Sequence, residues 1–156
     1  MGCKFVKRNK GFTLIELIVV VVIIGLFSAV ARPYYNQYQI KAARADVQAE
    51  MLRVAEQLIA YKALNNNYAN LNPLGSTNSM TYPTVNPRYT LTLSVKNSAS
   101  GATQGTNGAF ELKATPITSS QQKGDGVICL NQELYKYWEK GKTACSLTAT
   151  STWYGS

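Results

Sequence analysis

Histidine is absent from the 156 residues of this chain, so the side chain that most often acts as general base and metal ligand is missing. Acidic residues are few, eight against 16 lysines and arginines, and no nucleophile–base grouping stands out. Cysteine is limited to Cys3, Cys129 and Cys145. These absences predict that the chain is not an enzyme and that it uses no metal or other cofactor.

Charge is nearly missing from residues 12–31, where Glu16 is the single exception. About 20 apolar residues in a helix rise about 30 Å, which is enough to cross the hydrocarbon core of a bilayer. The valines and isoleucines would favour a strand in water, but an isolated strand cannot satisfy its backbone in lipid, so a helix is predicted. A carboxylate within such a span costs about 2.5–3.5 kcal/mol on insertion scales, which suggests that Glu16 has a function.

A short basic segment precedes the span and ends at the pair Gly11–Phe12. Four of the 16 cationic residues lie within residues 1–10. Cleavage between Gly11 and Phe12 would remove these charges and leave the apolar span attached, unlike cleavage of an ordinary secretory signal. The positive segment is expected on the cytoplasmic side, which places the C-terminal part across the membrane. In an oxidising compartment Cys129 and Cys145 are expected to form a disulfide, and two reduced, buried cysteines are the alternative.

The run Gly11-Phe12-Thr13-Leu14-Ile15-Glu16, with the Val/Ile/Leu tail that follows it, resembles the processing motif of type IV prepilins. The resemblance implies that a prepilin peptidase cuts after Gly11 and methylates the new amine of Phe12. Pro33 matches a proline that is common in these tails. The resemblance also implies that Glu16 pairs with the N-terminal amine of a neighbouring subunit, which sets the axial register of a filament.

The residues themselves point to the same kind of partner for Glu16. A carboxylate in lipid needs a cationic or hydrogen-bonding partner, and the amine that cleavage creates on Phe12 is the nearest cation. Because residues four apart share a helix face, this amine could belong to the same chain or to a neighbouring one. A protonated Glu16 without a partner is the competing interpretation. Arg32, at the other end of the span, departs from the usual apolar residue and is expected to reach the lipid head groups.

Residues 34–64 are predicted to continue the helix, with Pro33 kinking it rather than ending it. An apolar stripe recurs there at spacings of four and three residues, as in a soluble amphipathic helix. It consists of Val47, Met51, Val54, Leu58 and Tyr61. The charged residues on the other faces, Arg44 among them, are predicted to be solvated. The asparagines at 65–67 are expected to end the helix, because asparagine tolerates left-handed capping geometry.

The remainder of the chain alternates between polar segments and short apolar–polar repeats. Residues 65–88, with three of the five prolines, are predicted to form a long loop. Alternation predicts strands at 89–95, 109–115 and 127–131, and residues 134–138 extend the third strand or form a fourth. We therefore predict an α+β fold of the type IV pilin kind. Its long N-terminal helix packs on a three- or four-stranded antiparallel sheet, and Cys129 and Cys145 bound a C-terminal loop.

The resemblance divides the chain into four segments. These are a cleaved basic leader (1–11), a transmembrane and filament-core helix (12–33), the amphipathic half of the helix (34–64) and a globular head (65–156). The implied function is that of a structural subunit of a type IV pilus, and the C-terminal third resembles the PilE-like minor pilins. The sequence leaves open whether the subunit is major or minor, and whether the pilus serves adhesion, twitching motility or DNA uptake.

The resemblance also implies partners and a location. The expected partners are other pilin subunits, the prepilin peptidase and the inner-membrane machinery that assembles pili. Before assembly the chain is expected to cross the inner membrane once, with its head in the periplasm. After assembly it is expected in the extracellular pilus.

Two further functions remain as alternatives. Some relatives of the PilE-like subgroup bind DNA during uptake, and DNA binding needs clustered cations with stacking or base-reading groups nearby. The candidate DNA-binding residues are Lys136, Lys140, Lys142, Tyr137 and Trp138, to which Lys123 and Arg88 could add. Glu133 and Glu139 weaken the positive field, so a solvated lysine-rich loop is the competing interpretation. A type II secretion pseudopilin shares the leader and tail, but the cysteine loop and the PilE-like end argue against it.

Overall fold

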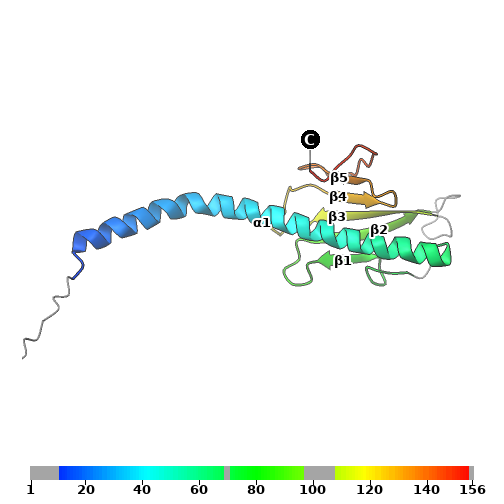
Figure 1. Cartoon of the computed structure of the whole chain (residues 1–156), viewed down its shortest axis with the longest axis horizontal. Helices are drawn as coiled ribbons and strands as arrows, with labels where there is room; N and C mark the ends of the chain where they lie inside the picture. Colours follow the sequence, from blue (N-terminus) through cyan, green and yellow to red (C-terminus); the bar gives the residue numbers. More distant parts are fainter. Residues whose placement is uncertain (1–10, 69–70, 97–107, 155–156) are drawn as a thin grey trace, which may run out of the picture. The chain divides into compact units, whose positions relative to one another are not determined.

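The computed structural model describes residues 11–68, 71–96 and 108–154. The predicted leader and Cys3, together with nearly all of the turn region expected at 98–108, lie outside these residues. The described elements are α1 (Leu14–Asn65), β1 (Ser79–Tyr82), β2 (Tyr89–Lys96), β3 (Ala109–Pro116), β4 (Ile128–Asn131) and β5 (Lys136–Trp138) (Figure 1). The chain divides into two compact units, an N-terminal unit of residues 1–38 and a head unit of residues 39–156.

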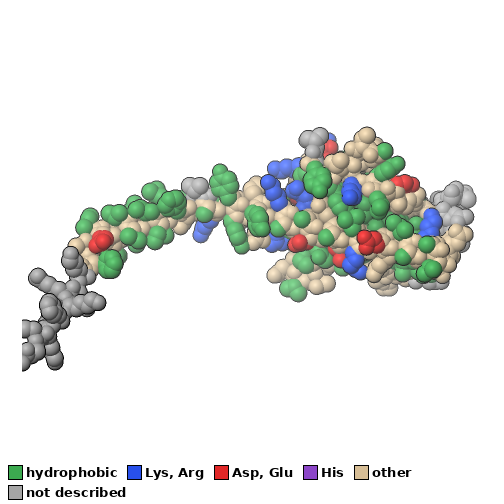
Figure 2. All heavy atoms as spheres, in the orientation of Figure 1, with side chains coloured by type: hydrophobic (Ala, Val, Ile, Leu, Met, Phe, Trp, Pro, Cys, Tyr) green, Lys and Arg blue, Asp and Glu red, His purple; other side chains and the backbone are tan. Residues whose placement is uncertain are grey.

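The start of α1 is set by Thr13, whose hydroxyl oxygen accepts a hydrogen bond from the backbone N–H of Glu16 at 3.3 Å. Threonine followed three residues later by glutamate is the capping-box pattern, which satisfies N–H groups that have no partner within the helix. The apolar side chains that follow are exposed, and Figure 2 shows them covering this part of the helix. Among the described residues, α1 alone has the length and apolar composition to cross a membrane.

The helix continues through Pro33, as predicted, and ends where the asparagines stand. Asn66 takes a left-handed φ of 54°, and its N–H donates to the carbonyl oxygen of Lys62 at 2.7 Å. The left-handed residue after the last turn is a common helix stop, and asparagine tolerates it better than most residues. The predicted helix end is therefore confirmed.

The sheet is an antiparallel meander in the order β1-β2-β3-β4-β5. The predicted strands at 89–95, 109–115 and 127–131 are β2, β3 and β4, and of the segment 134–138 only Lys136–Trp138 forms a strand, the separate β5. The prediction of an uninterrupted loop at 65–88 is wrong, because Ser79–Tyr82 pairs with β2 as strand β1. This strand has only four residues and stands directly before Pro83, so its local pattern is weak, and pairing with β2 across the connection at 83–88 decides its structure.

The core lies between the second half of α1 and one face of the sheet (Figure 1). Four residues of the predicted stripe are fully buried, and Tyr61 is half-buried. The sheet side of the core is formed by the inward positions of the strands, among them Leu91, Phe110, Leu112, Ile128 and Leu130. The prediction that the amphipathic helix covers the sheet is confirmed.

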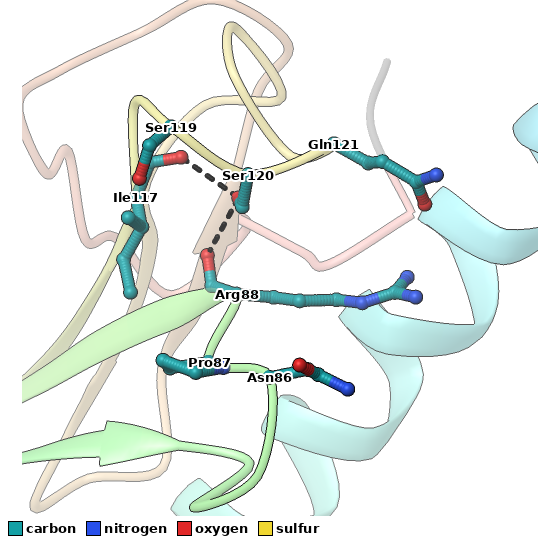
Figure 3. Close-up of a pocket in the computed structure, with 7 residues that line it drawn as sticks. All are labelled: Asn86, Pro87, Arg88, Ile117, Ser119, Ser120 and Gln121. Carbon is teal, nitrogen blue, oxygen red and sulfur yellow. Dashed lines mark hydrogen bonds between the residues drawn. The ribbon is translucent and has the colours of Figure 1, made fainter.

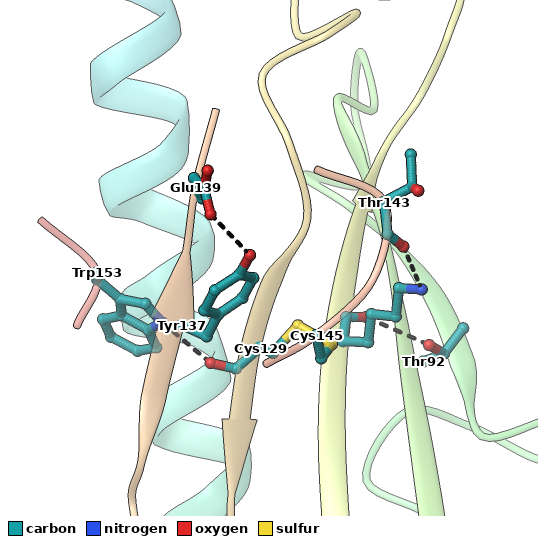
Figure 4. The surroundings of a disulfide bond; sticks show 8 residues. Thr92, Cys129, Tyr137, Glu139, Thr143, Cys145 and Trp153 are labelled. Carbon is teal, nitrogen blue, oxygen red and sulfur yellow. Dashed lines mark hydrogen bonds between the residues drawn. A yellow bond between two sulfur atoms is a disulfide. The ribbon is translucent and has the colours of Figure 1, made fainter. Parts of the chain in front are cut away.

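Cys129 and Cys145 form the predicted disulfide, with Cα atoms 5.9 Å apart (Figure 4). Cys129 lies on the sheet face opposite α1, because its neighbours Ile128 and Leu130 both belong to the core and side chains alternate along a strand. The carbonyl oxygen of Cys129 accepts a hydrogen bond from the indole N–H of Trp153 at 3.1 Å. The C-terminal segment is thus held to β4 both covalently and by a buried hydrogen bond.

Candidate functional site

The first candidate site is the start of α1, where Gly11, Phe12 and Glu16 lie. Gly11 and Phe12 precede the helix, and the Phe12 side chain is 84% exposed. Glu16 is exposed too, and it is the one acidic residue between residues 11 and 45. It occupies the third helical position, where the positive end of the helix dipole favours a carboxylate. The two residues of the predicted cleavage site are therefore exposed, and the acid stands about one turn further along the chain.

The helix start bears on which amine Glu16 can meet. The expectation that Phe12 and Glu16 share a helix face requires both to be helical. The helix begins at Leu14, with Thr13 as its cap, so Phe12 lies outside it. The helical geometry that would align the amine and carboxylate of one chain is therefore absent. Pairing of Glu16 with the amine of a neighbouring copy, which the resemblance to type IV prepilins implies, stays a prediction.

The second candidate site contains the basic and aromatic residues of the predicted DNA-binding cluster, which β5 divides between two faces. Trp138 pairs with Ile128 across the strands, and Lys136 pairs with Leu130, so both lie on the face that α1 covers. Tyr137 pairs with Cys129 on the opposite face, where its hydroxyl donates to a Glu139 carboxylate oxygen at 3.2 Å (Figure 4). The five residues therefore do not form one surface.

Lys136 and Trp138 are also engaged within the fold. The ammonium group of Lys136 lies 5.1 Å from the ring centre of Trp153. The guanidinium group of Arg44 stacks on Trp138, 3.6 Å from the ring centre, and the Trp138 indole N–H donates to the carbonyl oxygen of Asp125 at 3.0 Å. One face of the Trp138 ring is thus covered by the Arg44 guanidinium. If Trp138 stacks on a DNA base as predicted, it must do so with its other face.

Arg44 corrects another expectation, since it is not part of a solvated face. Its side chain is 16% exposed and forms a two-pronged ion pair with Asp125, whose side chain is 4% exposed. Tyr89 donates to the same carboxylate at 2.7 Å, and the Gln122 amide donates to the Tyr89 hydroxyl at 2.7 Å. Burial, and then the bond to Asp125, raise the pKa of Tyr89 far above its usual value, which keeps this hydroxyl a donor.

This buried network joins α1, β2, β5 and the segment between β3 and β4. Its location could not be read from the sequence, because Asp125 stands in a polar, turn-like stretch and Arg44 in a row of alternating charges. The one available signal was that Arg44 precedes the buried Val47 by three residues and so lies near the apolar stripe.

Two loops that carry exposed lysines are locked together beside the network. Gly126 has a φ of +96°, and the carbonyl oxygen of Glu139 lies 2.1 Å from where a Cβ atom would stand. The next N–H, of Val127, donates to the carbonyl oxygen of Lys142 at 2.9 Å. The loop before Gly126 contributes Lys123, and the loop at 139–142 contributes Lys140 and Lys142, all three exposed. We call these three lysines the basic rim.

Lys140 and Lys142 of the cluster predicted from the sequence belong to the basic rim. Lys136 does not, and Lys123 takes its place as the third lysine. Glu139 lies within it, with a carboxylate oxygen 3.5 Å from the Lys142 ammonium nitrogen. A pair this exposed has a weak interaction, so it lowers the positive field without removing it. The predicted contribution of Arg88 to this surface finds no support, because its guanidinium donates to the carbonyl and side-chain oxygens of Gln39 at 3.2 and 3.0 Å.

A shallow cavity of about 480 Å³ lies beside Arg88, between the start of β2 and the segment after β3 (Figure 3). Its lining consists of Asn86, Pro87, Arg88, Ile117, Ser119, Ser120 and Gln121. Figure 3 shows the Arg88 side chain reaching toward α1, and the Ser120 hydroxyl donates to the carbonyl oxygens of Arg88 and Ile117 at 3.3 and 2.7 Å. The lining holds neither a carboxylate nor a thiol, so it offers no base to activate a serine.

Comparison with known proteins covers both parts of the chain. Residues 6–31 match a family described as the prokaryotic N-terminal methylation motif. Residues 33–133 match a family described as type IV minor pilin ComP, DNA uptake sequence receptor. A fimbrial protein of Neisseria meningitidis serogroup A is 31% identical over 125 residues, which cover 77% of this chain and 70% of the relative.

Two other relatives show how the similarity is distributed. The type IV major pilin PilE1 of Neisseria gonorrhoeae is 30% identical over 77% of this chain and 73% of its own length. A fimbrial protein of Pseudomonas aeruginosa is 43% identical over 53 residues, which cover 33% of this chain and 34% of the relative. All three are named as pilins or fimbrial proteins and not as enzymes, which confirms the prediction of a non-enzymatic protein. With the methylation motif, the long apolar helix and the disulfide-bounded end, these matches show that the chain belongs to the type IV pilin family.

Proposed function

We propose that this pilin is a minor subunit of a type IV pilus, cut between Gly11 and Phe12 and N-methylated on Phe12. Before assembly the segment 12–33 spans the inner membrane with the head in the periplasm. During assembly the Glu16 carboxylate pairs with the Phe12 amine of a neighbouring copy. The observation that carries this is the site at the start of α1, where a single exposed carboxylate stands among exposed apolar side chains and Phe12 lies outside the helix.

Replacement of Glu16 tests the assembly step. Glu16→Ala is expected to remove most of this subunit from sheared pili while its membrane-bound level stays normal, because the apolar span persists and only the partner of the amine is lost. The subunit is quantified by immunoblot in pili sheared from cells that lack the native gene and express each variant, relative to the membrane fraction. Glu56→Ala is the matched control, since Glu56 is another exposed acid on the same helix. Equal incorporation of the Glu16→Ala and Glu56→Ala variants into pili would contradict the proposed pairing.

A second proposed function is DNA binding by the pilus-borne head. The family that matches residues 33–133 is described as a DNA uptake sequence receptor, and the match includes Lys123. Lys140 and Lys142 lie beyond the matched range, but the contacts of Gly126 and Val127 bring their loop against the one that carries Lys123. Three exposed lysines on two joined loops can meet phosphates, and such contacts give a binding constant that falls steeply with salt.

Substitution of the basic rim tests this second function. The Lys123→Ala/Lys140→Ala/Lys142→Ala variant is expected to bind duplex DNA at least about tenfold more weakly. Its plot of log affinity against log salt should be shallower by up to about 3, since each lost phosphate contact removes about one unit of slope. Fluorescence anisotropy of labelled duplex, titrated with detergent-solubilised full-length protein over a range of salt, measures both quantities.

The single variant Lys136→Ala distinguishes the rim from the cluster predicted from sequence. Lys136 lies over Trp153 on the face that α1 covers, so its loss should change the salt slope little. DNA binding that survives the triple substitution unchanged, or that is absent from the native protein even at low salt, would contradict the proposed role of the rim.

A further inference from the structure

Three tyrosines follow the apolar span almost at once. Tyr34, Tyr35 and Tyr38 are 74%, 62% and 71% exposed on α1. Tyr38 stands four residues after Tyr34 and three after Tyr35, so the three rings share one side of the helix. We call them the tyrosine stripe. Exposing three large aromatic rings to water is unfavourable, so we ask which environment covers them. They belong neither to the Glu16 site nor to the basic rim.

The position of the stripe along the helix indicates what surrounds it. Tyr35 stands 23 residues after Phe12, a rise of about 35 Å at 1.5 Å per residue. The hydrocarbon core of a bilayer is about 30 Å thick. When Phe12 lies at one membrane surface, the stripe therefore lies at the level of the opposite head groups. Tyrosine is enriched at this level because its ring is apolar and its hydroxyl can be hydrated.

The charges next to the stripe fit the same surrounding. Arg32 is exposed, and a groove of about 520 Å³ lies along the helix between Ala31, Arg32, Tyr35 and Asn36. No acidic residue occurs between residues 17 and 45. A guanidinium beside amphipathic rings, with no carboxylate nearby, suits the phosphates of lipid head groups, to which arginine binds in a two-pronged fashion.

We propose that the tyrosine stripe, with Arg32, is an interfacial anchor that fixes the depth of α1 in a phospholipid bilayer. The inference rests on the membrane-bound stage of the proposed function, to which it adds a group of residues that fixes the depth of the helix. The anchor holds the segment from Phe12 to Glu16 near the far membrane surface, where the new amine and the carboxylate are at hand for assembly. A helix without the anchor would sink or slide, since its apolar residues alone set no sharp depth.

The depth of the helix can be measured with single cysteines placed from residue 26 to residue 40 in full-length protein. The background carries Cys3→Ser, and the disulfide keeps Cys129 and Cys145 unreactive. The protein is reconstituted into vesicles of phosphatidylethanolamine and phosphatidylglycerol, and labelling by a charged maleimide marks the boundary between protected and reactive positions. With Tyr34→Ala/Tyr35→Ala/Tyr38→Ala this boundary is expected to move toward residue 40 by about one helical turn, about four residues.

Two controls sharpen the result. Replacing the three tyrosines by tryptophan should keep the boundary in place, since tryptophan prefers the same level. Tyr154→Ala removes a still more exposed tyrosine, which belongs to the head unit, and should also leave the boundary unchanged. A boundary that stays at the same residues in the triple-alanine variant overturns the inference. If that variant also yields fewer surface pili, the stripe belongs to contacts between pilin copies instead. Failure of the native chain to insert into vesicles would overturn the membrane-bound stage together with the anchor.

Discussion

Replacement of Asp125 by asparagine is expected to lower the free energy of unfolding of the head by about 3–5 kcal/mol, the cost of breaking a buried ion pair by removing one partner. The side chains of Asp125 and Arg44 are 4% and 16% exposed. Without the carboxylate charge, the guanidinium of Arg44 stays largely out of water beside a neutral amide and the Trp138 ring, with no negative charge to balance it. Tyr89 would also lose its charged acceptor.

Urea unfolding of detergent-solubilised full-length protein, followed by tryptophan fluorescence, measures this loss. Trp138 touches the network and Trp153 is buried against β4, so both rings report on the head. Lys142→Gln is the matched control, because it breaks the exposed pair with Glu139 and should cost less than about 1 kcal/mol. Adding Arg44→Met to Asp125→Asn should recover part of the stability, since no unpaired cation remains. An effect of Asp125→Asn as small as that of Lys142→Gln would show that the network is not a major support.

Substitution of Gly126 by alanine is expected to separate the loops that carry the basic rim. A methyl group there would stand 2.1 Å from the Glu139 carbonyl oxygen, and that oxygen belongs to the backbone, so a loop must move. The left-handed φ of +96° adds strain for any residue with a Cβ atom. The loops are joined by the packing of Gly126 on the Glu139 carbonyl and by the hydrogen bond from the Val127 N–H to the Lys142 carbonyl oxygen. When the packing is lost, we expect this hydrogen bond to break as well.

Gly124→Ala separates the two causes. Gly124 also has a left-handed φ, +79°, but nothing lies within 4 Å of the place where its methyl group would stand, so alanine there adds only the backbone strain. We expect Gly126→Ala to be less stable than Gly124→Ala by about 1–3 kcal/mol, the usual cost of overpacking. The same urea titration measures both variants. Equal losses would mean that the loops part without cost, and the packing of Gly126 against Glu139 would then not hold the rim together.

Local sequence patterns were sufficient to predict the structure where a single side chain or a single apolar periodicity determines it. The uncharged span with a threonine and a glutamate at its start predicts both the helix and the place of Glu16, because helix capping and apolar length are properties of consecutive residues. The stripe from Val47 to Leu58 likewise identifies the buried face of α1. Once the head was expected in an oxidising compartment, the two cysteines beyond the leader allowed one pairing, Cys129 with Cys145, and the structure chose it over the alternative of two reduced cysteines.

The pairing of strands and the face on which each side chain of a short strand lies were not accessible in this way. β1 forms because β2 lies beside it, although its four residues carry little strand signal of their own. The cluster predicted at the C-terminal end fails as a single surface because β5 is a strand, and alternation sends Tyr137 to one face and Trp138 to the other.

The sequence by itself thus determined that this chain has a membrane-length apolar helix with one acid at its start, an amphipathic continuation and a disulfide-bounded end. Only the tertiary structure decided what the charged residues of the head do. It buries Arg44 against Asp125 and Trp138 and brings the loop that carries Lys123 against the loop that carries Lys140 and Lys142. The physical reason is that apolar periodicity is a property of consecutive residues and can be seen in the sequence. The environment of a charged side chain depends instead on which loops pack against it in the folded protein.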